Sequence, residues 1–432
     1  MNCIGIIAEY NPFHIGHAHQ LEMVKTKYPD ALIVVAMSGS FVQRGEPALF
    51  DKFSRARWAL LNGAHAVVEL PTVYATANAE RFAAGGVRLL AKLGVTTLAF
   101  GSENDNAEVL WQMASLSRSE EVQSACRTYL QEGLSYGSAL RRALHDIMPD
   151  AVHNGPNTLL ALEYIKAIQA YKLSMDILPI KRTSSHHATD VDVTAPSGSA
   201  LRQAISTPVT PTADSLKADS PTAGSTTAGS PTANSPIERF QHIQPAFPPS
   251  IRSEVKDLLS GQNVTDYALY ESLCHFESRR QHSDDLLKYP DFSEGLHTLW
   301  TKAGAATDWS AAVEMIKSKR YTYARLRRMG SYTVLNLTKG LQDQAHSEGP
   351  LYGRLLGFTD EARHWLKSQS SQFPIVQKWS PFVQTATGLA KNMALLDTRA
   401  TDIRALCEKN PELRKGHMDY MQSPLYVPTK EQ

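Results

Sequence analysis

The stretch Ile4-Gly-Ile-Ile-Ala-Glu-Tyr-Asn-Pro-Phe-His-Ile-Gly-His17 decides the fold class of this chain. Its first five residues, 4–8, form an apolar run with the length of a buried strand. Asn11-Pro12 predicts a turn after that strand, and helical spacing of apolar residues follows over 17–27. A strand, a tight turn and a helix in this order predict the opening unit of a parallel sheet.

The same alternation continues downstream. Further strands are expected at 31–36, 64–70, 95–100 and 175–180, and helices at 51–62, 78–93 and 158–171. Near-continuous apolar strands joined by helical crossovers are typical of a parallel sheet that is covered on both faces. The sequence therefore predicts a doubly wound, Rossmann-like α/β domain that binds its ligands beyond the carboxyl ends of the strands.

Composition divides the 432 residues into four regions. Residues 1–205 hold the α/β pattern, and 206–238 are rich in Ser, Thr, Pro and Ala, which predicts a disordered insertion. Residues 239–345 predict a mostly helical domain, with helical spacing at 251–259, 267–278 and 309–319. The tail, 346–432, gives no confident strand, so its fold stays open.

Charge and targeting signals exclude several classes of protein. With 44 Lys and Arg against 43 Asp and Glu, the chain is not basic throughout, although a local basic patch remains compatible with this balance. No apolar run reaches the roughly 18–20 residues that span a bilayer, and the N-terminus lacks a signal peptide, so a cytoplasmic protein is expected. No zinc finger or disulfide framework is indicated, because the four cysteines are far apart: Cys3, Cys126, Cys274 and Cys407.

The pattern His14-x-Gly16-His17 opens the first helix and carries the main chemical signal. Two imidazoles beside a helix N-terminus suit an α-phosphate under attack, since they stabilise the charge that develops there. By itself, a pair of histidines three residues apart more often lies on the surface or in the core without a catalytic function, or binds a metal ion. The strand and Asn-Pro turn before it favour a nucleotide site, and the absence of a Walker or GxGxxG loop at this turn counts against P-loop kinases and dinucleotide enzymes.

Two other segments fit anions. Ser199 and Arg202 enter a short helix after 197–198 and are candidate phosphate contacts, although a serine there is usually an N-cap. Basic residues gather over 317–328, where Tyr321 and Tyr323 interleave them, and the pattern is equally compatible with RNA binding and with a solvated helix. The candidate RNA contacts are Lys317, Lys319, Arg320, Arg325, Arg327 and Arg328.

Six stretches together resemble the bacterial tRNA(Met) cytidine acetate ligase family, in the nucleotidylyltransferase superfamily. They are Gly5–His17, Ser38–Pro47, Val68–Pro71, Phe100–Glu103, Pro156–Tyr164 and Ile316–Arg328. The resemblance covers 1–205 and 239–370. The insertion at 206–238 and the tail depart from the family pattern.

The resemblance implies an activity, a set of partners and a role for each of two domains. Enzymes of this family use ATP to activate acetate as acetyl-adenylate and transfer the acetyl group to N4 of the wobble cytidine of elongator tRNA(Met). ATP as substrate, Mg²⁺, acetate and that tRNA are therefore expected, and no protein partner is. Residues 1–205 would form the catalytic ATP-binding domain, and 239–345 the tRNA-binding domain.

The resemblance also assigns residues. His14 and His17 would be catalytic, Gly101 would admit the adenine or ribose, and Asn157 would contact the nucleotide, although Asn157 alone is more often an N-cap. Arg182 would neutralise phosphate; Lys52 and Arg55 are weaker phosphate or tRNA candidates; Glu103 would orient a histidine or hold Mg²⁺. The ATP site would be lined by Ile7, Ala8, Glu9, Tyr10, Asn11, Pro12, Phe13, His14, Ile15, Gly16, His17, Ala18, His19 and Gln20.

Two alternatives compete with this reading. One is an adenylyltransferase of the same fold that acts on a small phosphomonoester and uses no RNA. The other is a non-enzymatic RNA-binding protein with a decayed nucleotide domain, which the intact His14, Gly16 and His17 argue against.

Overall fold

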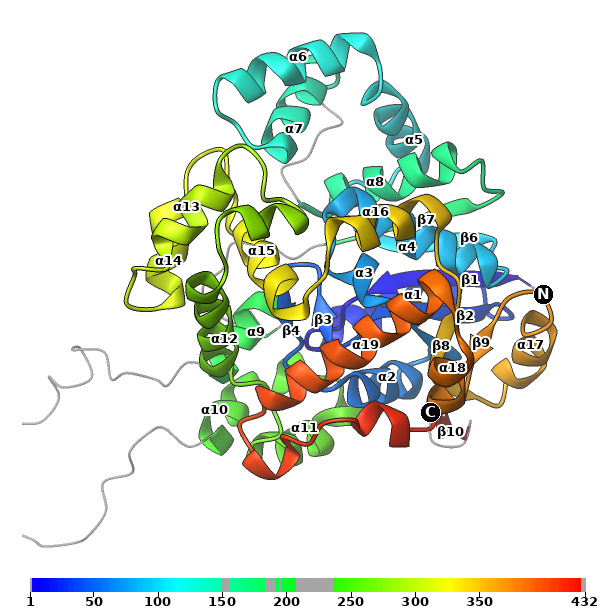
Figure 1. Ribbon diagram of the computed structural model, residues 1–432. Helices are drawn as coiled ribbons and strands as arrows, with labels where there is room; N and C mark the ends of the chain where they lie inside the picture. The colour runs from blue at the N-terminus through cyan, green and yellow to red at the C-terminus, as the bar shows by residue number, and fades with distance from the viewer. Residues whose placement is uncertain (1, 150–155, 183–191, 194–195, 207–235, 429–432) are drawn as a thin grey trace, which may run out of the picture.

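A mostly parallel sheet organises the chain in the computed structural model, which describes residues 2–149, 156–182, 192–193, 196–206 and 236–428 (Figure 1). The strand order is β10-β8-β5-β2-β1-β6-β7, with β9 paired to β8. The central strands are β1 (Cys3–Ala8), β2 (Leu32–Ser38), β5 (Ala66–Leu70), β6 (Thr97–Ser102) and β7 (Asp176–Lys181). All five were predicted, and all pair in parallel. Residues 207–235, in the predicted insertion, lie outside the described residues.

The C-terminal region, whose fold the sequence left open, completes this sheet. Strand β8 (Gly353–Thr359) pairs antiparallel with β5, and β9 (Ile375–Val376) and β10 (Leu425–Val427) pair parallel with β8. A separate two-stranded hairpin, β3 (Phe41–Val42) and β4 (Glu46–Pro47), follows β2. The last quarter of the chain is therefore part of the α/β architecture, next to the strands that the first quarter supplies.

Helices cover both faces of the sheet, as a doubly wound fold requires. Helices α4 (Ala79–Lys92) and α8 (Pro156–Ala170) pack on one face, and α1 (Ile15–Lys27) and α2 (Lys52–Leu61) on the other. Strand β1 contributes to both cores, because Ile4 and Ile6 pack toward α1 while Cys3 packs toward α4. This alternation confirms the predicted fold class.

The remaining helices surround this framework (Figure 1). Helices α5 to α7 project at one end, and α12 to α15 form a lobe beside the sheet. Helix α19 packs against α3 and α16. Their bounds are α3 Thr72–Ala75, α5 Ala107–Leu116, α6 Glu120–Gln131, α7 Tyr136–Ile147, α9 Gly198–Ser206, α10 Pro236–Ile243, α11 Arg252–Ser260, α12 Tyr267–Arg280, α13 Leu296–Ala303, α14 Trp309–Ile316, α15 Tyr323–Leu335, α16 Lys339–Glu348, α17 Ala362–Gln369, α18 Trp379–Thr385 and α19 Gly388–Leu406. Among the described residues, no helix is both long and apolar enough to cross a membrane.

The helix predicted over 309–319 is too long. Helix α14 ends at Ile316, and a new helix, α15, begins after Thr322, whose side chain accepts a hydrogen bond from the backbone N–H of Arg325. The basic segment 317–328 is therefore a loop followed by a helical turn rather than one helix.

Lys52 and Arg55 are buried, which corrects their assignment as phosphate or tRNA contacts. Lys52 Nζ lies 2.9 Å from Glu69 Oε1 and 3.0 Å from Asp419 Oδ2, and Arg354 Nη1 lies 2.7 Å from that same Asp419 oxygen. Arg55 donates to backbone carbonyls instead. Charges on a helix usually mark a solvated face, but here Glu69 of β5 and Asp419 of the C-terminal segment neutralise Lys52. Carbonyls of Glu9, Ser38 and Phe50 accept from Arg55.

Asp397 on α19 makes the stability of the fold depend on pH. Its carboxylate accepts hydrogen bonds from the Thr72 N–H (2.7 Å) and the Tyr352 hydroxyl. Burial, with a contribution from Glu69, raises the pKa of Asp397 from its usual 3.8 to about 7. A raised pKa means that the folded state binds the extra proton, so this contribution to stability is complete below about pH 4 and is lost as the pH rises through about 7.

We expect Asp397→Asn to remove this part of the pH dependence. Urea unfolding at about pH 5 and pH 8 should show that the wild-type chain loses more stability over this interval than the variant does. Asp30→Asn, at an exposed position, is the matched control and should retain the wild-type slope. Equal slopes for the wild type and Asp397→Asn would contradict the assignment.

Candidate nucleotide site

The His-x-Gly-His residues form a compact cap on α1. His14 is the N-cap, and its Nδ1 accepts a hydrogen bond from the Gly16 N–H at 3.1 Å. In return, His17 Nδ1 accepts from the His14 N–H at 3.3 Å. The two rings stack with centroids 3.8 Å apart, and a Cβ at Gly16 would sit 3.0 Å from the His14 ring. The glycine therefore leaves room for the His14 ring to fold back over the helix start.

This geometry fixes the proton on each neutral ring. Because Nδ1 of both histidines accepts a backbone N–H, the proton must lie on Nε2. Burial, His14 and Arg182 together lower the pKa of His17 well below its usual value. His17 therefore offers a neutral N–H donor at physiological pH.

The loop before the helix is held from several sides. Tyr10 and Phe13 turn into the core, while Asn11 Oδ1 accepts from the Leu49 N–H at 2.8 Å. The Asn11 carbonyl accepts from Arg202 Nη1 at 2.6 Å, and the buried Arg55 donates to the Glu9 carbonyl at 2.7 Å. Arg55 is thus a positioning residue of this loop.

A second helix terminus meets the first at the same edge of the sheet. Glu103, just after β6, accepts from the Thr158 N–H (2.7 Å), the Thr158 hydroxyl (2.8 Å) and Asn157 Nδ2 (2.7 Å) at the start of α8. Burial raises the pKa of Glu103, but these hydrogen bonds outweigh it and lower the pKa below its usual value. Glu103 therefore caps α8, and Asn157 lies in the first turn of the helix rather than at the N-cap.

Arg182 completes the arrangement from the end of β7. Its N–H donates to the Ser102 carbonyl at 2.9 Å, and Nη1 lies 3.5 Å from Asn157 Oδ1. A Cβ at Gly101 would come within 2.8 Å of the Arg182 side chain, so Gly101 makes room for this arginine. Burial lowers the pKa of Arg182, and Glu103 partly offsets this effect.

Together these groups form an anion site. Helices α1 and α8 aim their positive N-terminal ends at the carboxyl edge of β1, β6 and β7, where Arg182 adds a charge and the histidines add N–H donors. Among the described residues, no group of three or more His, Cys, Asp or Glu side chains is placed to hold a metal ion. The site can stabilise a polyphosphate by charge and hydrogen bonds.

The remaining predicted residues are distributed unevenly. Within 7–20, Tyr10, Asn11, Pro12 and Phe13 are buried, Gly16 and His19 are exposed, and the rest, apart from the buried His14, are partly buried. Ser199 and Arg202 lie on α9 beside this loop, but Arg202 already binds the Asn11 carbonyl and Glu46. Of the basic set, Lys319, Arg320 and Arg327 are exposed, whereas Lys317, Arg325 and Arg328 are partly buried.

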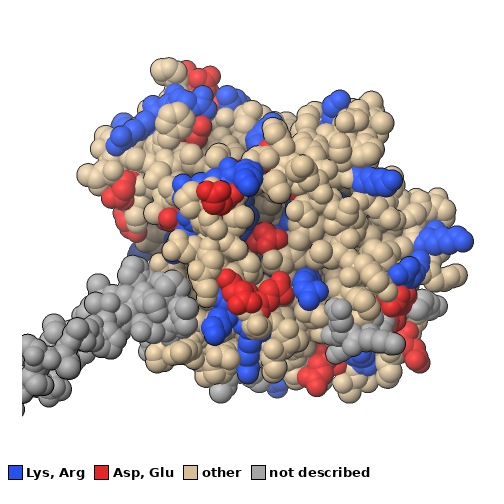
Figure 2. Space-filling model, turned by 90° about the horizontal axis from the view of Figure 1, so that it is seen from below, with Lys and Arg blue, Asp and Glu red and all other residues tan. Residues whose placement is uncertain are grey.

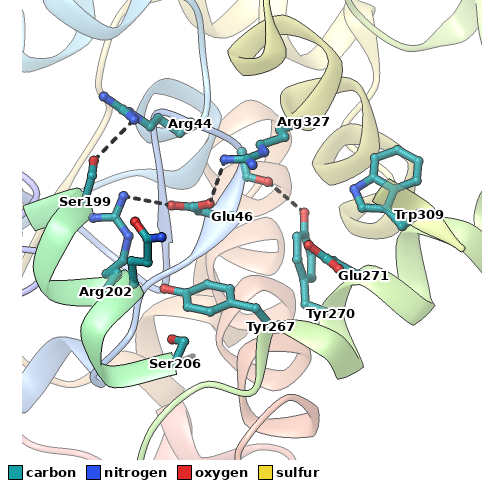
Figure 3. A pocket seen from close by; sticks show the side chains of 12 residues that line it. Arg44, Glu46, Ser199, Arg202, Ser206, Tyr267, Tyr270, Glu271, Trp309 and Arg327 are labelled. Carbon is teal, nitrogen blue, oxygen red and sulfur yellow. Dashed lines mark hydrogen bonds and ion pairs between the residues drawn. The ribbon is translucent and has the colours of Figure 1, made fainter. Parts of the chain in front are cut away.

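A pocket that no sequence pattern indicated lies next to this site. It has a volume of about 320 Å³ and is lined by residues of the β3–β4 turn, α9, α12, α14 and α15 (Figure 3). Arg44 and Glu46 line it, and both belong to the stretch Ser38–Pro47 that resembles the family. That stretch was the available signal, but nothing in the sequence gave it a role.

The sheet and its anion edge are those of a nucleotidyltransferase. A family model described as HIGH Nucleotidyl Transferase matches residues 1–419. A curated relative from Alkaliphilus metalliredigens, named tRNA(Met) cytidine acetate ligase, is 32% identical over 99% of this chain and 99% of its own length. A second, from Acetivibrio thermocellus and with the same name, is 31% identical over 98% of this chain and 99% of its own. The chain belongs to the tRNA(Met) cytidine acetate ligase family of enzymes.

Solved structures agree. The crystal structure of Thermotoga maritima TmcAL bound with alpha-thio ATP matches with a TM-score of 0.82 at 26% identity, over 99% of this chain and 100% of that one. The apo structure of the same protein matches with a TM-score of 0.84.

Proposed function

We propose that this enzyme activates acetate with ATP and transfers the acetyl group to N4 of the wobble cytidine of elongator tRNA(Met), in the cytoplasm. The names of the relatives support the reaction class and the tRNA, and the ATP analogue bound to the Thermotoga protein supports ATP. The single observation in this chain that carries the proposal is the stacked His14–His17 pair at the junction of two helix N-termini and Arg182.

In the first step an acetate oxygen attacks the α-phosphorus of ATP. The bond from that phosphorus to the bridging oxygen breaks, diphosphate leaves, and acetyl-adenylate remains. Acetate is already anionic, so the step needs no general base; it needs suppression of charge repulsion. Arg182, the Nε2–H groups of His14 and His17, and the two helix ends supply this stabilisation.

In the second step N4 of cytidine attacks the acetyl carbonyl carbon, the bond from that carbon to the phosphate oxygen breaks, AMP leaves, and the proton lost by N4 passes to water. An exocyclic amine is a weak nucleophile, so positioning of the base carries much of this step. Mg²⁺ would accompany the triphosphate as its counterion, because Glu103 already uses its carboxylate to cap α8.

Isotope exchange between ATP and labelled diphosphate tests the first step. We expect exchange that requires acetate. Exchange that requires a phosphomonoester instead would identify a small-molecule adenylyltransferase. Nucleoside analysis of elongator tRNA(Met) after incubation with the protein, ATP and labelled acetate tests the second step, with N4-acetylcytidine as the expected product.

The exposed basic residues before and on α15 are expected to bind tRNA. Arg327 has 48% of its side chain exposed, and Lys319 lies in the exposed loop before the helix. We expect Lys319→Ala with Arg327→Ala to weaken tRNA binding and to reduce the slope of log K against log salt by about two. Filter binding at several salt concentrations measures both quantities, and ATP binding should not change.

Arg328 is unsuitable for this test, since its side chain is only 12% exposed and lies 3.7 Å from Asp291. Lys391→Ala, at an exposed site on α19, serves as the control for loss of a surface charge. An unchanged salt slope in the Lys319 and Arg327 variant would move the RNA surface elsewhere. Figure 2 shows one face on which acidic and basic side chains are intermingled, so a limited patch is the expected form of any RNA surface there.

A further inference from the structure

The pocket beside the nucleotide loop has a polar and aromatic lining (Figure 3). Two contacts connect it to the nucleotide site. Arg202 lines it and also donates to the Asn11 carbonyl at 2.6 Å. The turn that carries Arg44 is tied to the same loop, because the Gln43 N–H donates to Glu9 Oε1 at 2.8 Å. The pocket therefore lies between the His-x-Gly-His loop and α15.

Its lining contains polar groups that keep hydrogen-bonding capacity within the described part of the chain. Ser206 Oγ is buried and has no hydrogen-bond partner among the described residues, and Tyr267 Oη is buried with the Asn11 side chain as its hydrogen-bond neighbour. Arg44 is exposed, and its hydrogen bond within the described chain is to Ser199 Oγ at 3.4 Å. Because Asn11 Oδ1 already accepts from the Leu49 N–H, the Asn11 amide donates to Tyr267 Oη and leaves the proton of the Tyr267 hydroxyl for a polar ligand.

The charged and aromatic residues of the lining also suit a ligand that carries both an anionic group and an aromatic ring. Glu46 lies 3.2 Å from Arg202 and 3.8 Å from Arg327, so one carboxylate is shared between two guanidinium groups. Arg44 and the outer side of Arg327 remain to bind an anion. Tyr267 and Trp309 add aromatic surface to the same pocket.

We propose that this pocket binds one unpaired nucleotide of the RNA substrate, with the phosphate toward Arg44 and Arg327 and the base against Tyr267. The volume of about 320 Å³ is at the small end of ligand pockets, which run from about 300 to 1,000 Å³, and suits a single nucleotide. RNA is read mainly at splayed, unpaired bases that stack on aromatic side chains. The inference rests on the proposed function, since it takes the RNA substrate as given.

The lining also favours a base with an amino group. Glu46 and Glu271 are acceptors for such a group, while the Tyr267 hydroxyl and Ser206 are donors for a neighbouring ring nitrogen or carbonyl. An amino donor beside a ring acceptor is the pairing edge of cytosine and adenine. Uracil presents a carbonyl in place of the amino group and would face a carboxylate.

The test uses the full chain with two RNAs: a stem-loop that carries the anticodon loop of elongator tRNA(Met), and a duplex of equal length without unpaired residues. Tyr267→Phe removes only the hydroxyl, and Arg44→Ala only the cation. We expect stem-loop binding to weaken about threefold to tenfold for Tyr267→Phe. For the double variant, which carries both Tyr267→Phe and Arg44→Ala, we expect it to weaken about tenfold or more. Binding of the duplex should fall much less.

Arg363→Ala and Tyr426→Phe, exposed residues on α17 and β10, are matched controls and should bind both RNAs as the wild type does. The readout needs neither ATP nor acetate, so it remains decisive even if the acetate reaction fails. The proposal would be overturned if Tyr267→Phe and the double variant both bound the stem-loop with the affinity of the wild type. A raised KM for ATP with unchanged RNA affinity would also overturn it and would put ATP in the pocket.

Discussion

His14→Asn and His17→Gln are each expected to reduce acetate-dependent ATP–diphosphate exchange by about 10²–10³-fold, the usual loss when an N–H donor to a developing charge is removed. Both imidazoles would donate from Nε2, since Nδ1 of each ring is occupied by a backbone N–H. Asparagine is too short to place a donor at the Nε2 position of His14, and a glutamine that bonds back to the His14 N–H turns its amide away from the direction of the lost Nε2–H. The loss should therefore appear in kcat more than in the affinity for ATP.

The substitutions are chosen to preserve the start of α1. Alanine at His14 would remove the N-cap of a buried residue and cost about 0.5–2 kcal/mol, whereas asparagine is among the best N-caps. Glutamine three residues after the cap can reach back to the N-cap N–H, as His17 does. Urea midpoints close to wild type would show that lost exchange is chemical. Normal exchange together with a lowered urea midpoint would show that the histidines only cap the helix.

His19→Asn is the internal control for this pair. His19 lies two residues beyond the motif and is exposed on α1, where its nearest charged neighbour is Glu22 at 3.8 Å. It was included in the predicted ATP-lining segment, but its exposure on the outer side of the helix predicts near-normal exchange. A loss as large as that of His14→Asn would extend the site along the helix.

Local patterns predicted the part of the structure that holds the nucleotide site. The run 4–8, the Asn11-Pro12 turn and the helix after His14 follow each other directly, so their order fixes the loop at the carboxyl end of β1. Strands β6 and β7 were equally visible as apolar runs. Once the sheet is parallel, its topology brings Gly101 and Arg182 to the same edge without any further information.

What the sequence could not predict depends on contacts between distant segments. Strand β8 has the sequence Gly-Arg-Leu-Leu-Gly-Phe-Thr. Its buried arginine, Arg354, interrupts the apolar run by which a buried strand is recognised in a sequence. Lys52 looked solvent-exposed because its partners, Glu69 and Asp419, are 17 and 367 residues away. The resemblance gave Glu103 two roles, orienting a histidine or holding Mg²⁺. In the structure its carboxylate caps α8, which the sequence does not reveal because it depends on where that helix begins.

Lys52→Met is expected to cause the largest loss of stability, about 3–5 kcal/mol, because it leaves two buried carboxylates with a single cation between them. Lys52 and Arg354 face Glu69 and Asp419 in a cluster whose side chains are at most 3% exposed. Burial raises the pKa of Asp419, but Lys52 and Arg354 outweigh it and lower that pKa below its usual value. With one cation removed, Glu69 and Asp419 share Arg354 alone.

The variant should also change how stability varies with pH. Without Lys52, one cation fewer lowers the folded-state pKa of Asp419, so that pKa rises and the stability lost through the substitution grows as the pH rises. Urea unfolding should therefore show a smaller deficit at about pH 5 than at pH 8. Adding Glu69→Gln should restore part of the loss, since it removes the unpaired charge. Lys391→Met, at an exposed site, should stay within about 0.5 kcal/mol of wild type. A similar small effect of Lys52→Met would mean that water reaches the cluster, and the C-terminal segment would then not be held to the sheet by these charges.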